Sequence, residues 1–136
     1  MSLPEIRVAL ETRLNALVPA IDTAWEDVTY SPKSGVPYQQ ITLLPSEPGS
    51  PTIGSSELVR ELGLLQVSLY YPIGEGMKRI SERAELLRSW FPKGLTLSSG
   101  GVNVTISKRA SVAPANRDGE WKVLPVSIPY FANVFV

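Results

Sequence analysis

Any chemistry in this chain would have to come from carboxylates, lysines, hydroxyls and amides, because two of the usual reactive residue types are absent. The 136-residue sequence contains no histidine and no cysteine. Without histidine there is no side chain whose ordinary pKa suits a general base near neutral pH, so a Ser–His–Asp or Cys–His hydrolase cannot be built. Without cysteine there are no disulfides, thiol nucleophiles or thiolate metal sites.

The acidic side chains are the main remaining candidates for acid–base or metal chemistry. Their spacing matches no metal-binding loop. They are scattered along the chain as Glu5, Glu11, Asp22, Glu26, Asp27, Glu47, Glu57, Glu61, Glu75, Glu82, Glu85, Asp118 and Glu120. The sequence also contains no phosphate-binding or dinucleotide-binding glycine motif. We therefore expect no catalytic residues, no cofactor and no metal, because each reaction class needs specific partner groups.

The charge balance argues against nucleic-acid recognition and against membrane binding. Thirteen basic residues are matched by thirteen acidic ones, so no net field attracts a polyanion. The basic run Lys78, Arg79, Arg83 and Arg88 is interleaved with glutamates, which favours a solvated helix face over a phosphate-binding one. No apolar run is long enough to cross a bilayer, and the N-terminus lacks the pattern of a secretory signal. These features predict a protein made and used in the cytoplasm.

Apolar periodicity predicts the elements that would position any site. A helix is expected over residues 2–18, with Ser2 and Glu5 as a capping box, and a second over residues 74–91. Strands are expected over residues 24–30, 37–44, 57–71, 95–98, 102–107 and 120–132. The order is helix, three strands, helix, three strands. We therefore expect a single α+β domain over residues 1–136, with a mixed, mainly antiparallel sheet of about six strands.

The strand over residues 57–71 is too long for a domain of this size. At roughly 3.3 Å per residue it would span about 50 Å, whereas a compact globule of this length has a diameter of roughly 37 Å. Gly63 is a plausible bend or bulge. We expect residues 65–71 to belong to the core sheet and residues 57–62 to form a projecting arm, paired with residues 37–44. Exposed leucines on such an arm, Leu58 and Leu62, would mark an interface.

Two long loops and an unusual last strand complete the pattern. Residues 45–56 contain three prolines, two glycines and four serines; they are either a tolerated surface loop or a segment that orders when a partner docks. Residues 108–119 are the second long loop. In the last strand, Pro125 and Pro129 are four residues apart, so their backbone positions point the same way and both missing N–H groups lie along one side of the strand. That pattern predicts an edge strand.

The order of these features resembles the tail terminator-like proteins of long-tailed phages and prophages. The resemblance covers nearly the whole chain and rests on element order and local phrases rather than on a catalytic signature. The phrases are SLPEIRVALETRLNAL, YQQITLLPSEP, IGSSELVRELGLLQVSLYYP, RAELLRSWFPKG, LSSGGVNVTI and VLPVSIPYFA.

The resemblance implies a structural role in the virion tail, assembled in the cytoplasm of a bacterial host. Proteins of this family cap the tail tube, typically as a hexameric ring, and present the surface to which the head attaches. The expected partners are further copies of the chain, the major tail tube protein and the head–tail connector. We expect one ring surface to use the arm, with Leu58, Arg60, Glu61 and Leu62. The other would use the loop of residues 108–119, with Arg109, Arg117 and Asp118.

Two alternatives stay open on the sequence. One is a head–tail joining or minor tail protein, which belongs to the same structural class. The other is a small cytoplasmic ligand-binding or adaptor domain, which would need an apolar pocket with convergent polar groups.

Overall fold

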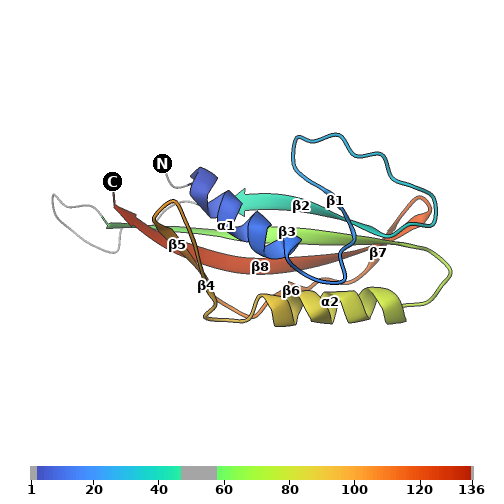
Figure 1. The fold of residues 1–136 in the computed structure, drawn as a ribbon. Helices are drawn as coiled ribbons and strands as arrows, with labels where there is room; N and C mark the ends of the chain where they lie inside the picture. Colours follow the sequence, from blue (N-terminus) through green and yellow to red (C-terminus); the bar gives the residue numbers. More distant parts are fainter. Residues whose placement is uncertain (1–2, 47–57, 136) are drawn as a thin grey trace.

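The fold is a mixed sheet with two helices. The computed structural model describes residues 3–46 and 58–135. Six strands follow one another in the order β1-β2-β3-β8-β5-β4, and the short strands β6 and β7 also pair with β8 (Figure 1). The elements are α1 (Leu3–Asn15), β1 (Asp22–Ala24), β2 (Tyr38–Pro45), β3 (Leu58–Pro72), α2 (Lys78–Trp90), β4 (Thr96–Ser99), β5 (Val102–Ile106), β6 (Ser111–Val112), β7 (Asn116–Asp118) and β8 (Trp121–Phe135). The predicted α+β class is confirmed.

The strands β3 and β8 form the long axis of the molecule. Each has 15 residues, and they pair antiparallel over their whole length, from Leu58 opposite Phe135 to Pro72 opposite Trp121. Such a ribbon spans about 50 Å, and Figure 1 shows it running the length of the sheet. The overlong strand predicted from the sequence is therefore real.

The arm has a different partner from the one predicted. β2 pairs with the core half of β3 and stops where Pro45 meets Gly63. Beyond that point β3 pairs with β8, so the arm consists of residues 58–62 of β3 and residues 131–135 of β8. The predicted pairing of residues 57–62 with residues 37–44 is wrong, because the register places those β2 residues beside residues 64–70 instead.

Gly63 lies at the root of the arm without forming a bulge. Its pairing is continuous with β2 on one side and with β8 on the other. A Cβ at this position would lie 2.5 Å from the Tyr130 hydroxyl, 2.7 Å from Tyr130 Cζ and 2.8 Å from the Leu44 carbonyl oxygen. Glycine is therefore required because the Tyr130 ring and the neighbouring strand approach the backbone closely. Of the two predicted alternatives, a bend or a bulge, the bulge is wrong.

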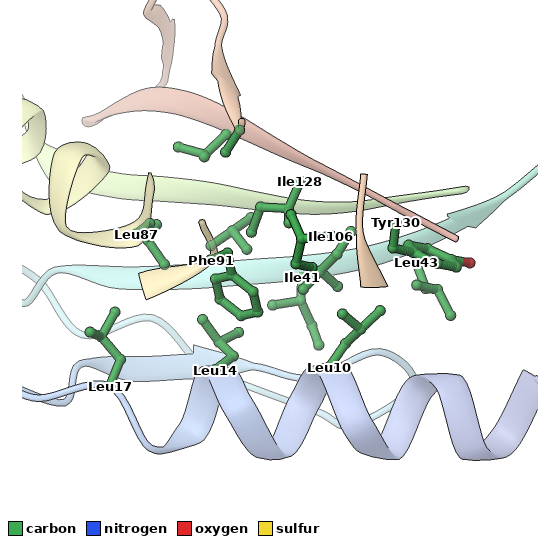
Figure 2. Packing of buried hydrophobic residues seen from close by; sticks show 14 of the residues in the cluster. Leu10, Leu14, Leu17, Ile41, Leu43, Leu87, Phe91, Ile106, Ile128 and Tyr130 are labelled. Carbon is green, nitrogen blue, oxygen red and sulfur yellow. The ribbon is translucent and has the colours of Figure 1, made fainter. Parts of the chain in front are cut away.

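Both helices pack on the same face of the sheet and share one apolar core. Figure 2 shows Leu10 and Leu14 of α1 pointing toward Ile41 of β2 and toward Phe91, which follows α2. These four side chains are each no more than 1% exposed. The helical stripe and the strand alternation predicted from the sequence are what build this core.

A reciprocal contact joins the ends of the two helices. The Arg13 guanidinium donates hydrogen bonds to the Trp90 carbonyl oxygen, at 3.2 Å from Nε and 2.8 Å from Nη2. Trp90 Nε1 in turn donates to the Arg13 carbonyl oxygen at 2.7 Å. The guanidinium carbon also lies 3.7 Å from the centre of the Trp90 ring, in a cation–π contact.

The first strand is shorter than predicted and is differently arranged. β1 ends at Ala24 and runs parallel to β2, so residues 25–30 are not a strand and no hairpin joins the predicted strand 24–30 to β2. The chain turns directly after β1, where Val28 N–H donates to the Trp25 carbonyl oxygen and Asp27 takes a φ of 59°. A positive φ is incompatible with an extended strand.

The last strand is central in the sheet, and the predicted edge position is wrong. Pro125 and Pro129 do share one side of β8, where their carbonyl oxygens accept hydrogen bonds from Ala113 N–H and Ser107 N–H, each at 3.0 Å. That side is covered by three short strands that pair with residues 130–132, 126–127 and 121–123 of β8. Each proline falls in a gap between two of these strands, where a missing N–H costs no ladder bond.

The structure also corrects the predicted start of α2 and the predicted loop over residues 108–119. α2 begins at Lys78 rather than at residue 74, because Gly74 and Gly76 have φ values of 89° and 84° and form the preceding turn. The predicted loop over residues 108–119 contains β6 and β7. The hairpin around Gly100 and Gly101 is confirmed, with Ser99 opposite Val102. The capping residue Ser2 and the segment 47–56 lie outside the described residues.

Candidate functional site

Arg60 and Leu62 lie on the same face of the arm, because strand residues two apart point the same way. Arg60 Nε donates a hydrogen bond to Asn133 Oδ1 at 3.0 Å, directly across the ribbon, and its guanidinium carbon lies 4.6 Å from the centre of the Phe131 ring. Arg60 is thus exposed but held in place by β8. The side chain of Leu58, another predicted interface residue, lies outside the described part of the chain.

Exposed leucines gather around the root of the arm. Leu3, Leu44 and Leu62 are 40%, 42% and 38% exposed. We call these three residues the arm patch. Leu3 and Leu62 line one cavity of about 200 Å³ together with Pro45, and Leu44 precedes Pro45 in β2. Leu44 and Leu62 point away from the helices, because they alternate with the buried Leu43 and Leu65, whereas Leu3 of α1 lies on the helix face. Apolar exposure on both faces of the arm root is typical of a protein–protein contact rather than of a solvated surface.

Glu61 occupies the opposite face of the ribbon from Arg60 and Leu62, because successive strand residues alternate. It is partly exposed and borders the same cavity as Leu3 and Tyr130. Burial raises the pKa of the Tyr130 hydroxyl, and the negative charge of Glu61 raises it further. The arm therefore presents one charged residue on each face of its root.

The second predicted surface contains Arg109, Arg117 and Asp118. Arg109 is exposed and lies 3.7 Å from Glu85 of α2. Arg117 Nε donates to the Gly119 carbonyl oxygen at 3.3 Å, and Asp118 pairs with Trp121 at the start of β8. These residues are therefore on β7 and on the segment before β6 rather than on an unstructured loop.

The structure does not bring the two predicted surfaces together. Glu61 lies opposite Ala132 near the end of β8, whereas Asp118 lies opposite Trp121 at its start. At 3.3 Å per residue, these positions on β8 are about 35 Å apart. The arm and β7 thus mark opposite ends of β8, so one subunit can offer them to two different neighbours. Arg109 lies between these ends, because Ser107 bonds to Pro129 and Ser111 pairs with Ser127.

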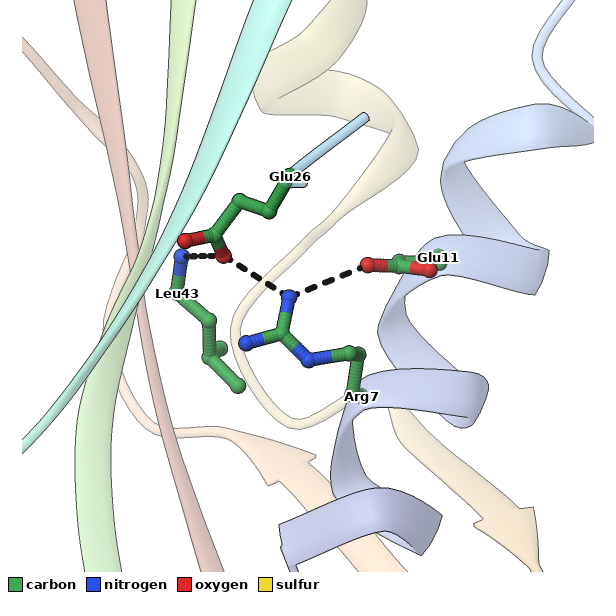
Figure 3. Close-up of polar contacts among 4 residues, drawn as sticks. All are labelled: Arg7, Glu11, Glu26 and Leu43. Carbon is green, nitrogen blue, oxygen red and sulfur yellow. Dashed lines mark hydrogen bonds and ion pairs between the residues drawn. The ribbon is translucent and has the colours of Figure 1, made fainter. Parts of the chain in front are cut away.

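A partly exposed ion pair, not anticipated from the sequence, ties α1 to the outer side of β2 (Figure 3). Glu26 Oε1 accepts a hydrogen bond from Arg7 Nη1 at 2.7 Å and another from the Leu43 backbone N–H at 2.8 Å. Arg7 Nη1 also lies 3.3 Å from Glu11 Oε2. The Glu26 carboxylate thus takes the place of a neighbouring strand at Leu43, where β2 would otherwise expose an unpaired edge group.

This contact should make the stability of the protein depend on pH in the acid range. Burial tends to raise the pKa of Glu26, but the hydrogen bonds from Leu43 and Arg7 together with the Arg7 charge outweigh it and lower the pKa. Because the pKa of Glu26 is lower in the folded protein, the ionised carboxylate stabilises the fold at pH values above the ordinary glutamate pKa of about 4.3. This stabilisation is lost as the pH falls through the pKa of Glu26 in the folded protein. We expect Glu26→Gln to flatten the fall in Tm between pH 5 and 3. An unchanged slope would contradict this role.

The described residues contain no group of three or more acidic side chains placed to hold a metal ion. Within residues 3–46 and 58–135, no helix is long and apolar enough to cross a membrane. The candidate site is therefore the surface of the arm and of the β7 end, where the groups present can make apolar contacts, hydrogen bonds and ion pairs.

Several residues of this surface were missed by the sequence analysis. Phe131 and Asn133 complete the arm, and Leu3 and Leu44 complete the arm patch. One signal was present: apolar residues continue beyond residue 132, at Val134 and Phe135. No local sequence pattern indicated Leu3 and Leu44, because their positions at the root of the arm depend on the register of β2 and on the packing of α1.

Comparison with known proteins identifies the family. A family model described as phage tail terminator protein matches residues 5–130. The chain belongs to the phage tail terminator protein family. A tail terminator-family chain is a phage tail completion protein, a structural component of the tail that works through contacts with other tail and head proteins. The resemblance inferred from the sequence is thus confirmed.

A solved structure supports the same fold for this terminator-family protein. It shares 26% sequence identity and a TM-score of 0.78, and the match covers 97% of this chain and 96% of the other. The search of curated proteins gives no match. The two chains therefore share their overall fold over nearly their full length.

Proposed function

We propose that this protein caps the tail tube when the tail reaches its final length and then forms the surface to which the head attaches. The observation that carries the proposal is the family match over residues 5–130. The family relationship supports tail completion, and capping is the way in which a tail is completed before head joining. A capping protein needs no catalytic group, in keeping with the lack of histidine and cysteine.

We further propose that it acts as a ring, with six copies as the expected number. A closed ring uses heterologous contacts, in which one surface of a subunit meets a different surface of the next. The arm patch and the β7 end are suited to this because they lie at opposite ends of β8. Arg60 and Glu61 on one side, with Arg117 and Asp118 on the other, offer charges of both signs that would set the register.

The partners proposed on this basis are further copies of the chain, the major tail tube protein and the head–tail connector. Rings that formed before the tube was complete would compete with capping. The free protein is therefore expected to be monomeric when dilute and to assemble on tube ends.

Light scattering tests this proposal. The mass of the purified protein is measured across a wide concentration range, alone and with purified tail tubes. A monomer that becomes a six-copy ring on tube ends, or a six-copy ring in solution that binds those ends, is the expected result. A monomer that ignores tubes at every concentration would overturn the capping role.

A further inference from the structure

Arg60 is an exposed arginine of the arm whose charge meets no carboxylate of its own subunit. None of the ion pairs among residues 3–46 and 58–135 includes it. Its Nε donates to Asn133, and the Phe131 ring lies against its guanidinium. Its two Nη nitrogens bond to no group of the described residues. Because β8 already holds the side chain in place, its binding to an anion outside the subunit costs little conformational entropy.

Asp118 of β7 is the matching acid. It is exposed, and within the described ranges its carboxylate takes part in no ion pair or hydrogen bond. Arg117 precedes it but points to the opposite face, because successive strand residues alternate. The Arg117 Nε donates instead to the Gly119 carbonyl oxygen. The Asp118 carboxylate is therefore open to a cation from outside the subunit.

An aromatic cluster lies beside Asp118. Asp118 is opposite Trp121 in the register of β7 and β8. Trp121 meets the Tyr38 ring edge-on at 5.2 Å, and Tyr38 stacks on Tyr70 at 4.5 Å with 8° between the ring planes. Burial raises the pKa of the Tyr70 hydroxyl, and the negative charge of Asp118 raises it further. A carboxylate beside aromatic rings suits a guanidinium, which can pair with the acid and lie against a ring.

Arg60 and Asp118 share one face of the sheet but lie at opposite ends of β8. Arg60 is opposite Asn133, and Asp118 is opposite Trp121. Asn133 and Trp121 are an even number of residues apart, so both pairs point to the face that carries no helix. At 3.3 Å per residue the two pairs are about 40 Å apart, so Arg60 cannot reach Asp118 of its own copy. Between two copies joined end to end, the side chains can meet without crossing the sheet.

We propose that the Arg60 guanidinium of one copy binds the Asp118 carboxylate of the next, with the Tyr70 ring beside the pair. The two Nη donors match the two oxygens of a carboxylate. In a closed ring of heterologous contacts each copy gives one arginine and receives one, so every such charge is paired. This inference rests on the proposed ring and names the contact that the arm makes in it.

Charge reversal tests the pair. Arg60→Glu places two acids at each contact, and Asp118→Arg places two arginines there. Each single variant should need a concentration at least about tenfold higher than wild type to assemble, because like charges meet at every contact. The double variant Arg60→Glu with Asp118→Arg restores opposite charges and should assemble within about threefold of the wild-type concentration. All these changes are at exposed positions, so the Tm should stay close to that of the parent.

The matched control is the double variant Arg60→Glu with Glu82→Arg. Glu82 is exposed on α2, which packs on the other face of the sheet. This control has the same net charge as the reversed pair but leaves two acids at the proposed contact, so it should assemble as poorly as Arg60→Glu alone. Light scattering measures assembly of each protein in solution over a wide concentration range and on purified tube ends.

The inference is overturned if the single variants assemble like wild type, or if the reversed pair assembles no better than the control. Capping by the wild-type protein without rescue by the reversed pair would reject this contact and leave the capping role in place. Rescue in solution with tube ends left bare would support the contact and contradict capping. A wild-type protein that stays monomeric in solution and on tubes would overturn both.

Discussion

Leu62→Asp is expected to abolish ring assembly and binding to tube ends while the fold is retained. Leu62 belongs to the arm patch and borders the cavity that Leu3 and Pro45 also line. In an interface, an aspartate there would lose its hydration without gaining a partner. Loss of a central apolar contact costs about 2 kcal/mol or more per interface, which is about 30-fold in affinity. Every interface of a ring would suffer this loss.

The matched control for this substitution is Val28→Asp. Val28 is 61% exposed and lies in the turn after β1, away from the arm. Both variants should keep a Tm close to that of the parent protein, because each replaces an exposed side chain. The measurement is light scattering with tail tubes. If Leu62→Asp assembled as well as Val28→Asp, the arm patch would not be an interface. Arg60→Glu provides a second test, because it reverses a charge on the same face of the arm.

Gly63→Ala is expected to lower the free energy of unfolding by about 1–3 kcal/mol, the usual cost of overpacking a well-packed site. The added Cβ would meet the Tyr130 ring at 2.5–2.7 Å and the Leu44 carbonyl oxygen at 2.8 Å. Tyr130 is 1% exposed, so its ring has little room to move. Denaturant unfolding followed by circular dichroism measures the loss, and the Tm should fall by several degrees.

The control for Gly63→Ala lies on the same strand. Ser68→Ala changes a half-buried residue that has no such contact and should alter stability by less than about 0.5 kcal/mol. In the double variant with Tyr130→Leu, the alanine should cost less than it does alone, because the two sites are in contact. Additive losses, or a stable Gly63→Ala protein, would contradict the assigned role of this glycine.

Features that depend on neighbouring residues were predictable from the sequence. Apart from their first members, Leu3 and Met77, which are exposed, the predicted apolar stripes of both helices are correct because helical spacing is local. The turn at Gly100 and Gly101 is correct because both residues adopt positive φ, 55° and 82°, which a two-residue hairpin requires. The core-facing residues of β8 are correct because the strand period is two. Their buried members are Leu124, Val126, Ile128 and Tyr130.

Features that depend on pairing between distant strands were not predictable. Pro125 and Pro129 showed which side of β8 lacks two N–H donors. They did not show that the short strands β5, β6 and β7 would each pair with part of that side. The partner of the arm was wrong for the same reason, because strand length alone does not fix register. A parallel β1 was missed because a short strand gives no directional signal.

The same distinction applies to the candidate site. Arg60, Glu61 and Leu62 could be chosen because they interrupt a strand pattern within a few residues. The arm patch could not, because Leu3, Leu44 and Leu62 come from three segments that only the fold brings together. Arg83 was read as solvated because the surrounding glutamates suggested an exposed helix face, whereas packing against Pro19 buries it.

The capping role is tested most directly by the length of tail tubes. The major tail protein is polymerised with and without this protein, and tube lengths and ends are recorded by electron microscopy. We predict that saturating protein stops elongation and leaves a ring on tube ends, and that Leu62→Asp does neither. Tubes that continue to lengthen from bare ends in the presence of saturating wild-type protein would contradict the proposal.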